Sequence, residues 1–197
     1  TFTILTTWQR GRELVTRLRV HDEWPLRAFI EQLHAMKPPL ARVPGTAVFL
    51  NRGKATAPLA MRANVEHNHV LHSHVVILTI ETTNAPHIPA AERITVDDLG
   101  YKDDQITHVT ARFGYMDPQN VPALLPLIRE AEIERPLESG ELSYFLSRIE
   151  IILGHTPGMS RWRKRLFIAT SQITADAAEV FQLPREQTLI VGSRIEL

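Results

Sequence analysis

Hydrophobic and polar positions along the 197-residue chain switch repeatedly between a strand-like and a helix-like period. The strongest strand signal lies at 75–82, a nearly continuous apolar and β-branched run typical of a central strand that is covered on both faces. Apolar runs or alternating patterns predict five further strands, at 46–50, 94–98, 105–114, 142–152 and 189–197.

Helical patterns fill the stretches between these strands. They predict helices at 7–19, 25–37, 58–66, 122–131 and 160–183. The second helix presents one apolar stripe, formed by Leu26, Phe29, Ile30 and Leu33. The last helix has the clearest period, and its predicted buried stripe is Trp162, Leu166, Ala169, Ile173, Ala177 and Val180.

The order of these elements predicts the fold class. Three strand–helix–strand units favour a mixed α/β (α+β) fold, a mixed β-sheet with helices packed on its faces. No repeat, low-complexity tract or long linker divides the chain. We therefore expect one α/β domain over 21–197, with 1–20 as an N-terminal helical appendage.

Composition narrows the function classes. Lys and Arg number 22 and Asp and Glu number 22, and this balance argues against a nucleic-acid binder, which normally carries a basic excess. The absence of cysteine excludes disulfides, thiolate zinc sites and cysteine nucleophiles. No nucleophile elbow, phosphate-binding glycine loop or paired-carboxylate motif occurs, so we expect no enzyme and no cofactor.

The first twenty residues are locally basic, with four Arg against one Glu. Trp8, Arg10 and Arg12 lie close together there. Tryptophan and arginine are enriched where membrane helices leave the bilayer on the cytoplasmic side. An ordinary basic amphipathic helix has the same local pattern, and short helices of that kind are common.

Four histidines fall within eight residues, at His67, His69, His72 and His74. Imidazoles are common metal ligands, but these four straddle the end of a predicted helix and the start of a strand. No carboxylates accompany them as supporting groups. A polar, partly solvated turn is the favoured interpretation, and we expect no metal.

A dense basic cluster, Arg161, Trp162, Arg163, Lys164 and Arg165, begins the last predicted helix. The macrodipole is positive at that end, so cations there are mildly unfavourable. A local rule broken without visible compensation often marks an interaction surface. Anionic lipid headgroups, a phosphate-bearing ligand or an acidic segment of another subunit would fit, and a solvated basic face is the alternative.

Several segments, taken in order from about Thr6 to the end of the chain, resemble the KUP (Kup/HAK/KT) family of potassium uptake transporters. They are Thr6-Thr7-Trp8 with Arg10-Gly11-Arg12, Pro44-Gly45-Thr46-Ala47-Val48-Phe49-Leu50, His67-Asn68 with Val70-Leu71-His72, Val75-Val76 with Leu78-Thr79 and Glu81, Ala111-Arg112-Phe113-Gly114-Tyr115-Met116 with Val121-Pro122, Ser143-Tyr144-Phe145-Leu146, Pro157-Gly158-Met159 with Trp162-Arg163, and Leu183-Pro184.

The resemblance implies the C-terminal cytosolic domain of a proton-coupled potassium transporter in the cell membrane, with a regulatory or assembly role and no part of the ion pathway. Residues 1–20 become a juxtamembrane segment that follows the last membrane helix. The implied partners are the membrane part of the same transporter and a second copy of the domain. His69 and His74 depart from the family pattern, where basic residues are frequent.

The alternative function is a nucleotide-sensing domain that controls potassium uptake, with a cyclic dinucleotide as the ligand that the resemblance suggests. Its phosphates would need arginine side chains or backbone N–H groups. The residues that we expect to bind such a ligand are His67, Asn68, His72 and Arg112.

Overall fold

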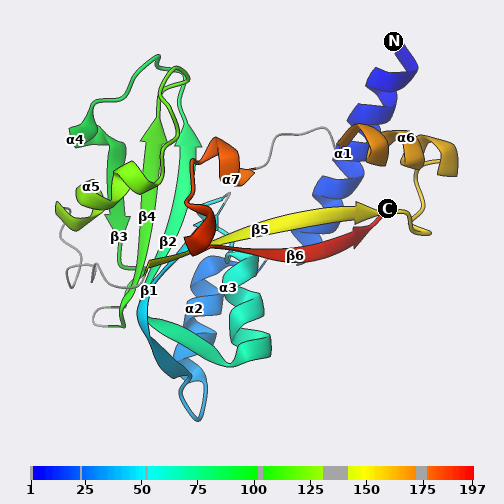
Figure 1. The fold of residues 1–197 in the computed structure, drawn as a ribbon. Helices are drawn as coiled ribbons and strands as arrows, with labels where there is room; N and C mark the ends of the chain where they lie inside the picture. The colour runs from blue at the N-terminus through cyan, green and yellow to red at the C-terminus, as the bar shows by residue number, and fades with distance from the viewer. Residues whose placement is uncertain (1, 23, 52, 102–103, 131–141, 172–176) are drawn as a thin grey trace. The chain divides into compact units, whose positions relative to one another are not determined.

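A six-stranded sheet, in the order β3-β4-β2-β1-β5-β6, runs through the structure (Figure 1). This computed structural model describes residues 2–22, 24–51, 53–101, 104–130, 142–171 and 177–197. The strands are β1 (Ala41–Asn51), β2 (Val70–Thr82), β3 (Ile94–Asp97), β4 (Ile106–Phe113), β5 (Leu142–Ile152) and β6 (Thr188–Glu196). All six predicted strands are confirmed.

Helical elements lie between the strands along the chain. They are α1 (Phe2–Asp22), α2 (Leu26–Ala35), α3 (Leu59–Ala63), the π-helical turn η1 (Asn64–Asn68), α4 (Ala90–Arg93), the 3₁₀ turn η2 (Pro122–Leu124), α5 (Leu125–Glu130), α6 (Arg161–Ser171), α7 (Ala177–Val180) and the 3₁₀ turn η3 (Arg185–Gln187).

The sheet is mixed, which confirms the predicted α/β class. Strand β1 pairs in parallel with β2 and β5, β2 pairs in parallel with β4, and β3 runs antiparallel to β4. The arrows of β5 and β6 point the same way in Figure 1. Leu197 donates to the carbonyl of Ile152 and accepts from the N–H of Gly154, which is the hydrogen-bond pattern of parallel strands.

The central strands are buried on both faces, as the continuous apolar run predicted. Val75 and Ile77 of β2 belong to one core, which also contains the predicted stripe of α2. Val76 and Leu78 belong to a second core, with Leu124 of η2. Side chains alternate across a strand, so a run without polar residues is what two apolar cores require.

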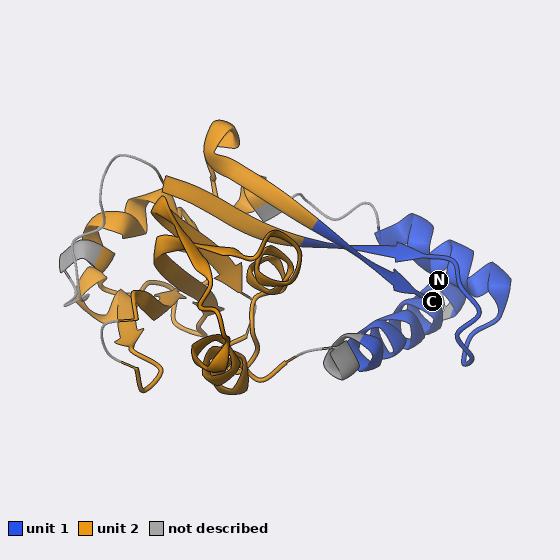
Figure 2. Cartoon of the chain, turned by 90° about the horizontal axis from the view of Figure 1, so that it is seen from below, with its two compact units in different colours: residues 1–23, 148–176, 192–197 blue, residues 24–147, 177–191 orange. Residues whose placement is uncertain are grey.

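Contacts between residues divide the chain into two compact units (Figure 2). Unit 1 contains residues 1–23, 148–176 and 192–197, and unit 2 contains residues 24–147 and 177–191. The two cores just described belong to unit 2. Strands β5 and β6 each contribute residues to both units.

Unit 1 is built on a close approach of α1 to α6. A Cβ atom on Gly11 would overlap the Phe167 ring, so only glycine allows the ring to pack directly on the α1 backbone. The Trp8 ring also contacts Phe167, with 5.3 Å between the ring centroids. Leu14, Val15 and Leu197 complete a small apolar cluster with Phe167.

The predicted last helix is wrong in its C-terminal end and in its buried face. Helix α7 ends at Val180, and residues 172–176, which include Ile173, lie outside the described part of the chain. The buried residues of α6 are Lys164 and Phe167, whereas Trp162 is 57% exposed. The space left by the missing side chain of Gly11 accommodates Phe167, so α6 buries the face that carries Phe167. The spacing of apolar residues along the helix did not predict this face.

Polar groups also occur inside the sheet of unit 2. His108 of β4 is 4% exposed, and its Nε2 atom forms a 3.0 Å hydrogen bond with Oγ1 of Thr79 on β2. Burial lowers the pKa of His108 below its ordinary value, and this effect outweighs the opposing influence of the Asp97 and Glu81 carboxylates. The neutral imidazole is therefore the form that the folded state favours.

The lowered pKa of His108 predicts a loss of stability in mild acid. Below about pH 6.5 the unfolded chain protonates this histidine more readily than the folded chain does. The free energy of unfolding therefore decreases as the pH is lowered. We expect His108→Gln, which does not titrate, to reduce that dependence in urea unfolding at about pH 7.5 and about pH 5.5. His67→Gln, which replaces an exposed histidine, is the control substitution. Equal pH dependence in wild type and His108→Gln would contradict this assignment.

The contact at Gly11 predicts that alanine destabilises unit 1. Alanine normally stabilises a helix interior by about 1 kcal/mol relative to glycine, but here its methyl group must displace the Phe167 ring. Overpacking of this kind costs about 1–3 kcal/mol, so we expect Gly11→Ala to lower the thermal midpoint followed by circular dichroism. Gly192→Ala is the matched control because a Cβ there meets nothing within 4 Å. A midpoint that Gly11→Ala leaves unchanged would show that the contact does not form.

Candidate functional site

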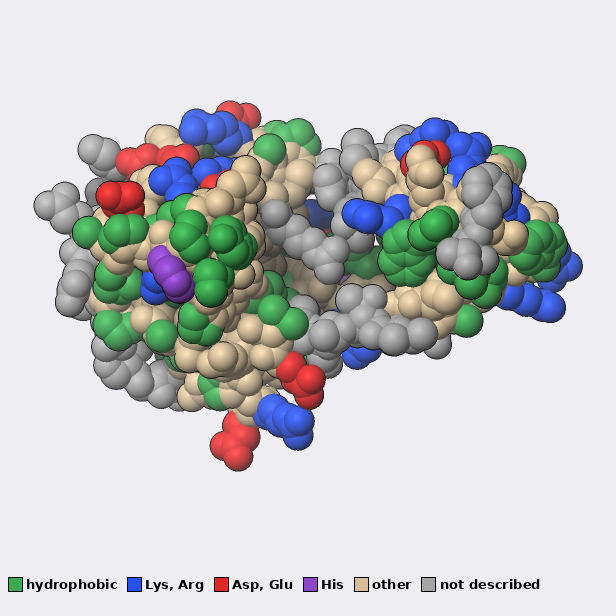
Figure 3. Space-filling model, turned by 90° about the horizontal axis from the view of Figure 1, so that it is seen from above, with side chains coloured by type: hydrophobic (Ala, Val, Ile, Leu, Met, Phe, Trp, Pro, Cys, Tyr) green, Lys and Arg blue, Asp and Glu red, His purple; other side chains and the backbone are tan. Residues whose placement is uncertain are grey.

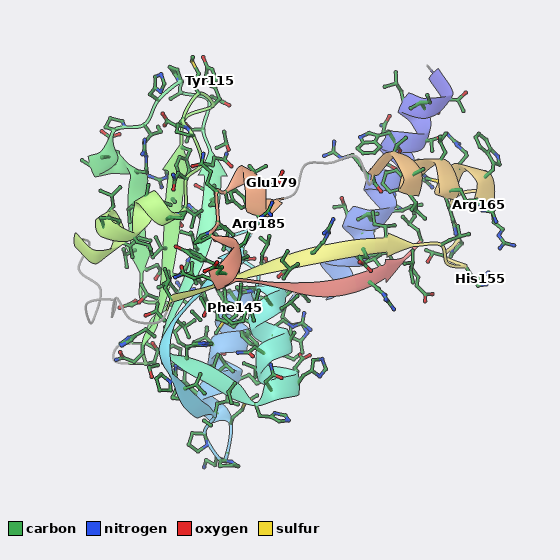
Figure 4. The ribbon with its side chains drawn as sticks, in the orientation of Figure 1. Tyr115, Phe145, His155, Arg165, Glu179 and Arg185 are labelled. Carbon is green, nitrogen blue, oxygen red and sulfur yellow. The ribbon has the colours of Figure 1, made fainter. Side chains whose placement is uncertain are left out.

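The predicted basic cluster occupies the first turn and a half of α6, and the helix divides it into two groups. Five consecutive residues span more than one helical turn, so they cannot all face one direction. Arg163 is half-buried and Lys164 is 3% exposed, so these two side chains face the interior of unit 1. Arg161, Trp162 and Arg165 are exposed, and Figure 4 shows Arg165 pointing away from the helix.

Arg163 joins the start of α6 to α1. Its Nε atom donates to Oγ1 of Thr7 and its Nη2 atom donates to Oγ1 of Thr6, each at 2.9 Å. Thr7 is 1% exposed, so the first of these bonds satisfies a buried hydroxyl. The guanidinium carbon of Arg163 also lies 6.0 Å from the centre of the Trp162 ring. Arg163 is thereby held beside the second turn of α1.

Lys164 holds the loop that precedes α6. Its ammonium group donates to the carbonyl of Gly154 at 3.1 Å and to that of Thr156 at 2.7 Å. A buried ammonium needs such acceptors to replace water. Arg163 and Lys164 therefore make their contacts within unit 1, whereas Arg161 and Arg165 make no ion pair with any residue that the structure describes.

The predicted juxtamembrane residues lie on α1. Trp8 packs on Phe167, as described above. Arg10 donates to the carbonyl of Gly158 at 3.4 Å and pairs with Glu13 at 3.1 Å. Arg12 is exposed. Two of these three side chains therefore contribute to the packing of α1 within unit 1.

The predicted ligand-binding residues lie in unit 2, and three of them are near each other in the chain. His67 and Asn68 are exposed in η1, where Asn68 donates to Oδ1 of Asn64 at 2.8 Å. His72 lies near the start of β2, and its ring meets the edge of the Phe145 ring with 5.6 Å between centroids.

Arg112 lies toward the other end of the sheet. It is opposite Glu81 in the parallel register of β4 with β2, and its Nε atom is 3.7 Å from a Glu81 carboxylate oxygen. Glu81 is nine residues beyond His72 along β2, and a strand advances about 3.3 Å per residue, so the separation is about 30 Å. The structure does not bring Arg112 together with His67, Asn68 and His72.

Sequence reasoning missed a cluster at the C-terminal end of β4, where Gly114 to Asp117 form a turn. We call it the Asp117 clasp. The Asp117 carboxylate accepts hydrogen bonds from His87 Nδ1 at 2.7 Å, Gly114 N at 2.9 Å, Ile88 N at 3.0 Å and Arg93 Nη2 at 3.3 Å. The hydrogen bond from His87, followed by those from the two backbone N–H groups, holds the pKa of Asp117 well below its usual range.

The Asp117 clasp presents two large side chains to solvent. Tyr115 and Met116 are each 62% exposed, and Figure 4 shows Tyr115 at the loop tip beyond β4. Their N–H groups donate to the carbonyls of Ala85 and Pro86. The available sequence signal was the Gly-Tyr-Met-Asp turn that follows a parallel strand. Ligands of parallel sheets bind at the C-terminal ends of the strands, which is where this turn lies. The partners of Asp117 could not be read from it because they lie up to 30 residues away.

The described ranges contain neither a metal-binding cluster nor a helix that could span a membrane. Within them, no group of three or more His, Asp or Glu side chains is placed to hold a metal ion. None of the helices in those ranges combines the length and the apolar character needed to cross a bilayer.

Comparison with known proteins gives a consistent result. Residues 44–197 match the family described as K+ potassium transporter C-terminal domain. The chain is 61% identical over 196 residues to the probable potassium transport system protein Kup of Rhodococcus jostii. It is 39% identical over 196 residues to the Kup protein of Aromatoleum aromaticum and 37% identical over 197 residues to that of Cutibacterium acnes.

These alignments cover 98–100% of this chain but 30% of each relative, so the chain spans about a third of their length. No solved structure matches it. The relatives are named as components of potassium transport and not as enzymes. Because the family match covers most of the chain and one relative is 61% identical over all of it, this chain belongs to the family of potassium transporter C-terminal domains.

Proposed function

We propose that this chain is the cytosolic C-terminal domain of a Kup-type, proton-coupled potassium uptake transporter of the cell membrane. In this proposal it has a regulatory and assembly role and contributes no part of the ion pathway. The observation that carries the proposal is the family match over residues 44–197, in a chain that corresponds to 30% of relatives named as potassium transport proteins. Its partner is the membrane part of the same transporter.

The packing of α1 supports a regulatory role. Under this proposal α1 follows the last membrane helix, with Trp8, Arg10 and Arg12 near the cytoplasmic side of the bilayer. Helix α1 contacts α6 through Gly11 and Phe167, and it is bonded to Arg163. A change in the membrane part that moves α1 would therefore alter contacts inside a folded unit. Regulation requires such contacts to differ between two states of the transporter.

The assembly role includes the predicted homodimer. Strand β6 lies at one end of the strand order, so no described strand pairs with its outer edge. Leu189 and Ile190 on β6 are 48% and 46% exposed. A long edge strand with exposed apolar side chains is a ready surface for pairing with another chain. Light scattering of the purified chain over a range of concentrations tests this pairing, and a monomer throughout would contradict it.

The nucleotide-sensing alternative gains no comparable support from the described residues. Its phosphate-binding arginine, Arg112, lies about 30 Å from His72 by strand register. The same arginine is already within 3.7 Å of the Glu81 carboxylate.

Uptake measurements on the natural gene that contains this stretch test the proposal. In bacterial cells that lack potassium transporters, we expect it to support rubidium uptake that a protonophore abolishes. Gly11→Ala loosens α1 from α6, and we expect it to change the uptake rate by about fivefold or more, the lower range of allosteric coupling.

The matched control is Gly192→Ala, which has free space around its new methyl group and should retain the wild-type rate. Immunoblots of membrane fractions must show equal amounts of the three proteins. Unchanged uptake in Gly11→Ala at equal abundance would contradict a regulatory role, and absence of uptake in the wild type would contradict the transporter assignment.

A further inference from the structure

The zero net charge of the chain conceals a separation of charge between its two units. The residue ranges of unit 1 contain ten Lys and Arg against six Asp and Glu, a net charge of +4. Those of unit 2 contain twelve against sixteen, a net charge of −4. Lys and Arg outnumber Asp and Glu among the described side chains on the face of unit 1 that Figure 3 shows. An anionic partner would therefore be attracted to unit 1.

Within unit 1 the exposed face of α6 combines cations with a large aromatic side chain. Arg161 and Arg165 are one helical turn apart, and Trp162 is three residues before Arg165, so the three share one face. Phe167 lies on the opposite face of α6, and both Phe167 and Lys164 are buried. Packing of Phe167 on Gly11 thus fixes which side of the helix remains outside. We call these three residues, Arg161, Trp162 and Arg165, the outer α6 face.

The fold itself does not compensate the two exposed arginines. They lie in the first turns of α6, where the helix dipole is positive and a cation is unfavourable. No acidic residue occurs in that first turn, and neither arginine pairs with a described carboxylate. Arg163 and Lys164 differ because each donates two hydrogen bonds inside unit 1. Among the four basic residues of α6, the uncompensated charge is therefore confined to the outer α6 face.

We propose that the outer α6 face binds the anionic phospholipid headgroups of the membrane. Arginine binds phosphate oxygens through paired N–H donors. Tryptophan prefers the headgroup region, because there its apolar ring contacts lipid while its N–H group stays hydrated. Trp162 is 57% exposed, which is unfavourable in water and suited to that region. The proposal deepens the proposed function and rests on it for the presence of a nearby bilayer.

Contacts between α6 and α1 support a lipid surface over a soluble acidic partner. Arg163 bonds to Thr6 and Thr7 of α1, so the outer α6 face is fixed to the helix that would leave the membrane. The adjacent turn of α1 exposes Ile4 by 51% and Leu5 by 63%. Apolar side chains beside arginines and a tryptophan are the composition of a helix that lies at a membrane surface.

Vesicle binding of the 197-residue chain tests the proposal. Co-sedimentation is measured with vesicles of phosphatidylcholine alone and of phosphatidylcholine mixed with phosphatidylglycerol. We expect binding to the mixed vesicles, weakened by added salt. One arginine near an anionic surface contributes about fivefold in affinity, so Arg161→Gln with Arg165→Gln should weaken binding about 25-fold.

The matched control removes two other exposed arginines. Arg185 and Arg194 have side chains that are 93% and 76% exposed, and their double replacement by Gln removes the same charge. We expect it to change binding by less than about twofold. Equal weakening by both double variants would overturn the proposal, because it would show attraction to overall charge alone. Binding to soluble polyglutamate but not to vesicles would overturn it in favour of an acidic protein partner.

Trp162 provides a spectroscopic readout. We expect a blue shift of tryptophan fluorescence on addition of mixed vesicles, and we expect Trp162→Phe to remove most of it, because Trp8 is already packed on Phe167. An unchanged shift in Trp162→Phe would overturn the placement of this side chain in lipid. The proposed function is tested separately by rubidium uptake. If uptake responds to Gly11→Ala as expected but the chain does not bind vesicles, only the lipid-binding proposal is rejected.

Discussion

The orientation of α6 on α1 is the constraint on which the functional argument depends. Phe167 packs where Gly11 has no side chain, and Arg163 bonds to two threonines of α1. Together these contacts fix the rotation of α6 about its own axis. Lys164 is consequently directed toward backbone carbonyls, and Arg161 and Arg165 remain exposed. A helix rotated by half a turn would bury uncompensated arginines, at a much larger cost.

The strands and the α2 stripe could be predicted because their signal is local. A strand covered by two cores has few polar residues, and β2 shows that directly between Val75 and Leu78. The α6 face could not be predicted in this way. An analysis of apolar spacing assigns every lysine to the exposed face. The Lys164 ammonium is nevertheless buried, because it donates hydrogen bonds to the carbonyls of Gly154 and Thr156.

The candidate sites show the same limit. The basic cluster was found from sequence, but its division into two inward and three outward residues needed the helix contacts. The predicted ligand residues failed to converge because strand register places Arg112 opposite Glu81, far from His72. The Asp117 clasp was missed because its carboxylate gathers donors from a separate loop, and short-range patterns contain no information about such partners.

The Asp117 clasp has a consequence for the loop tip that it holds. One carboxylate binds the 87–88 segment to the 114–117 turn, so Tyr115 and Met116 project from backbone that is already ordered. Association normally costs about 0.5–1.5 kcal/mol for each side chain that must be immobilised, with more for a loop that must also be ordered. At this tip the cost of ordering the loop is already covered by folding. Tyr115 and Met116 are therefore presented at the end of the sheet on a preorganised backbone.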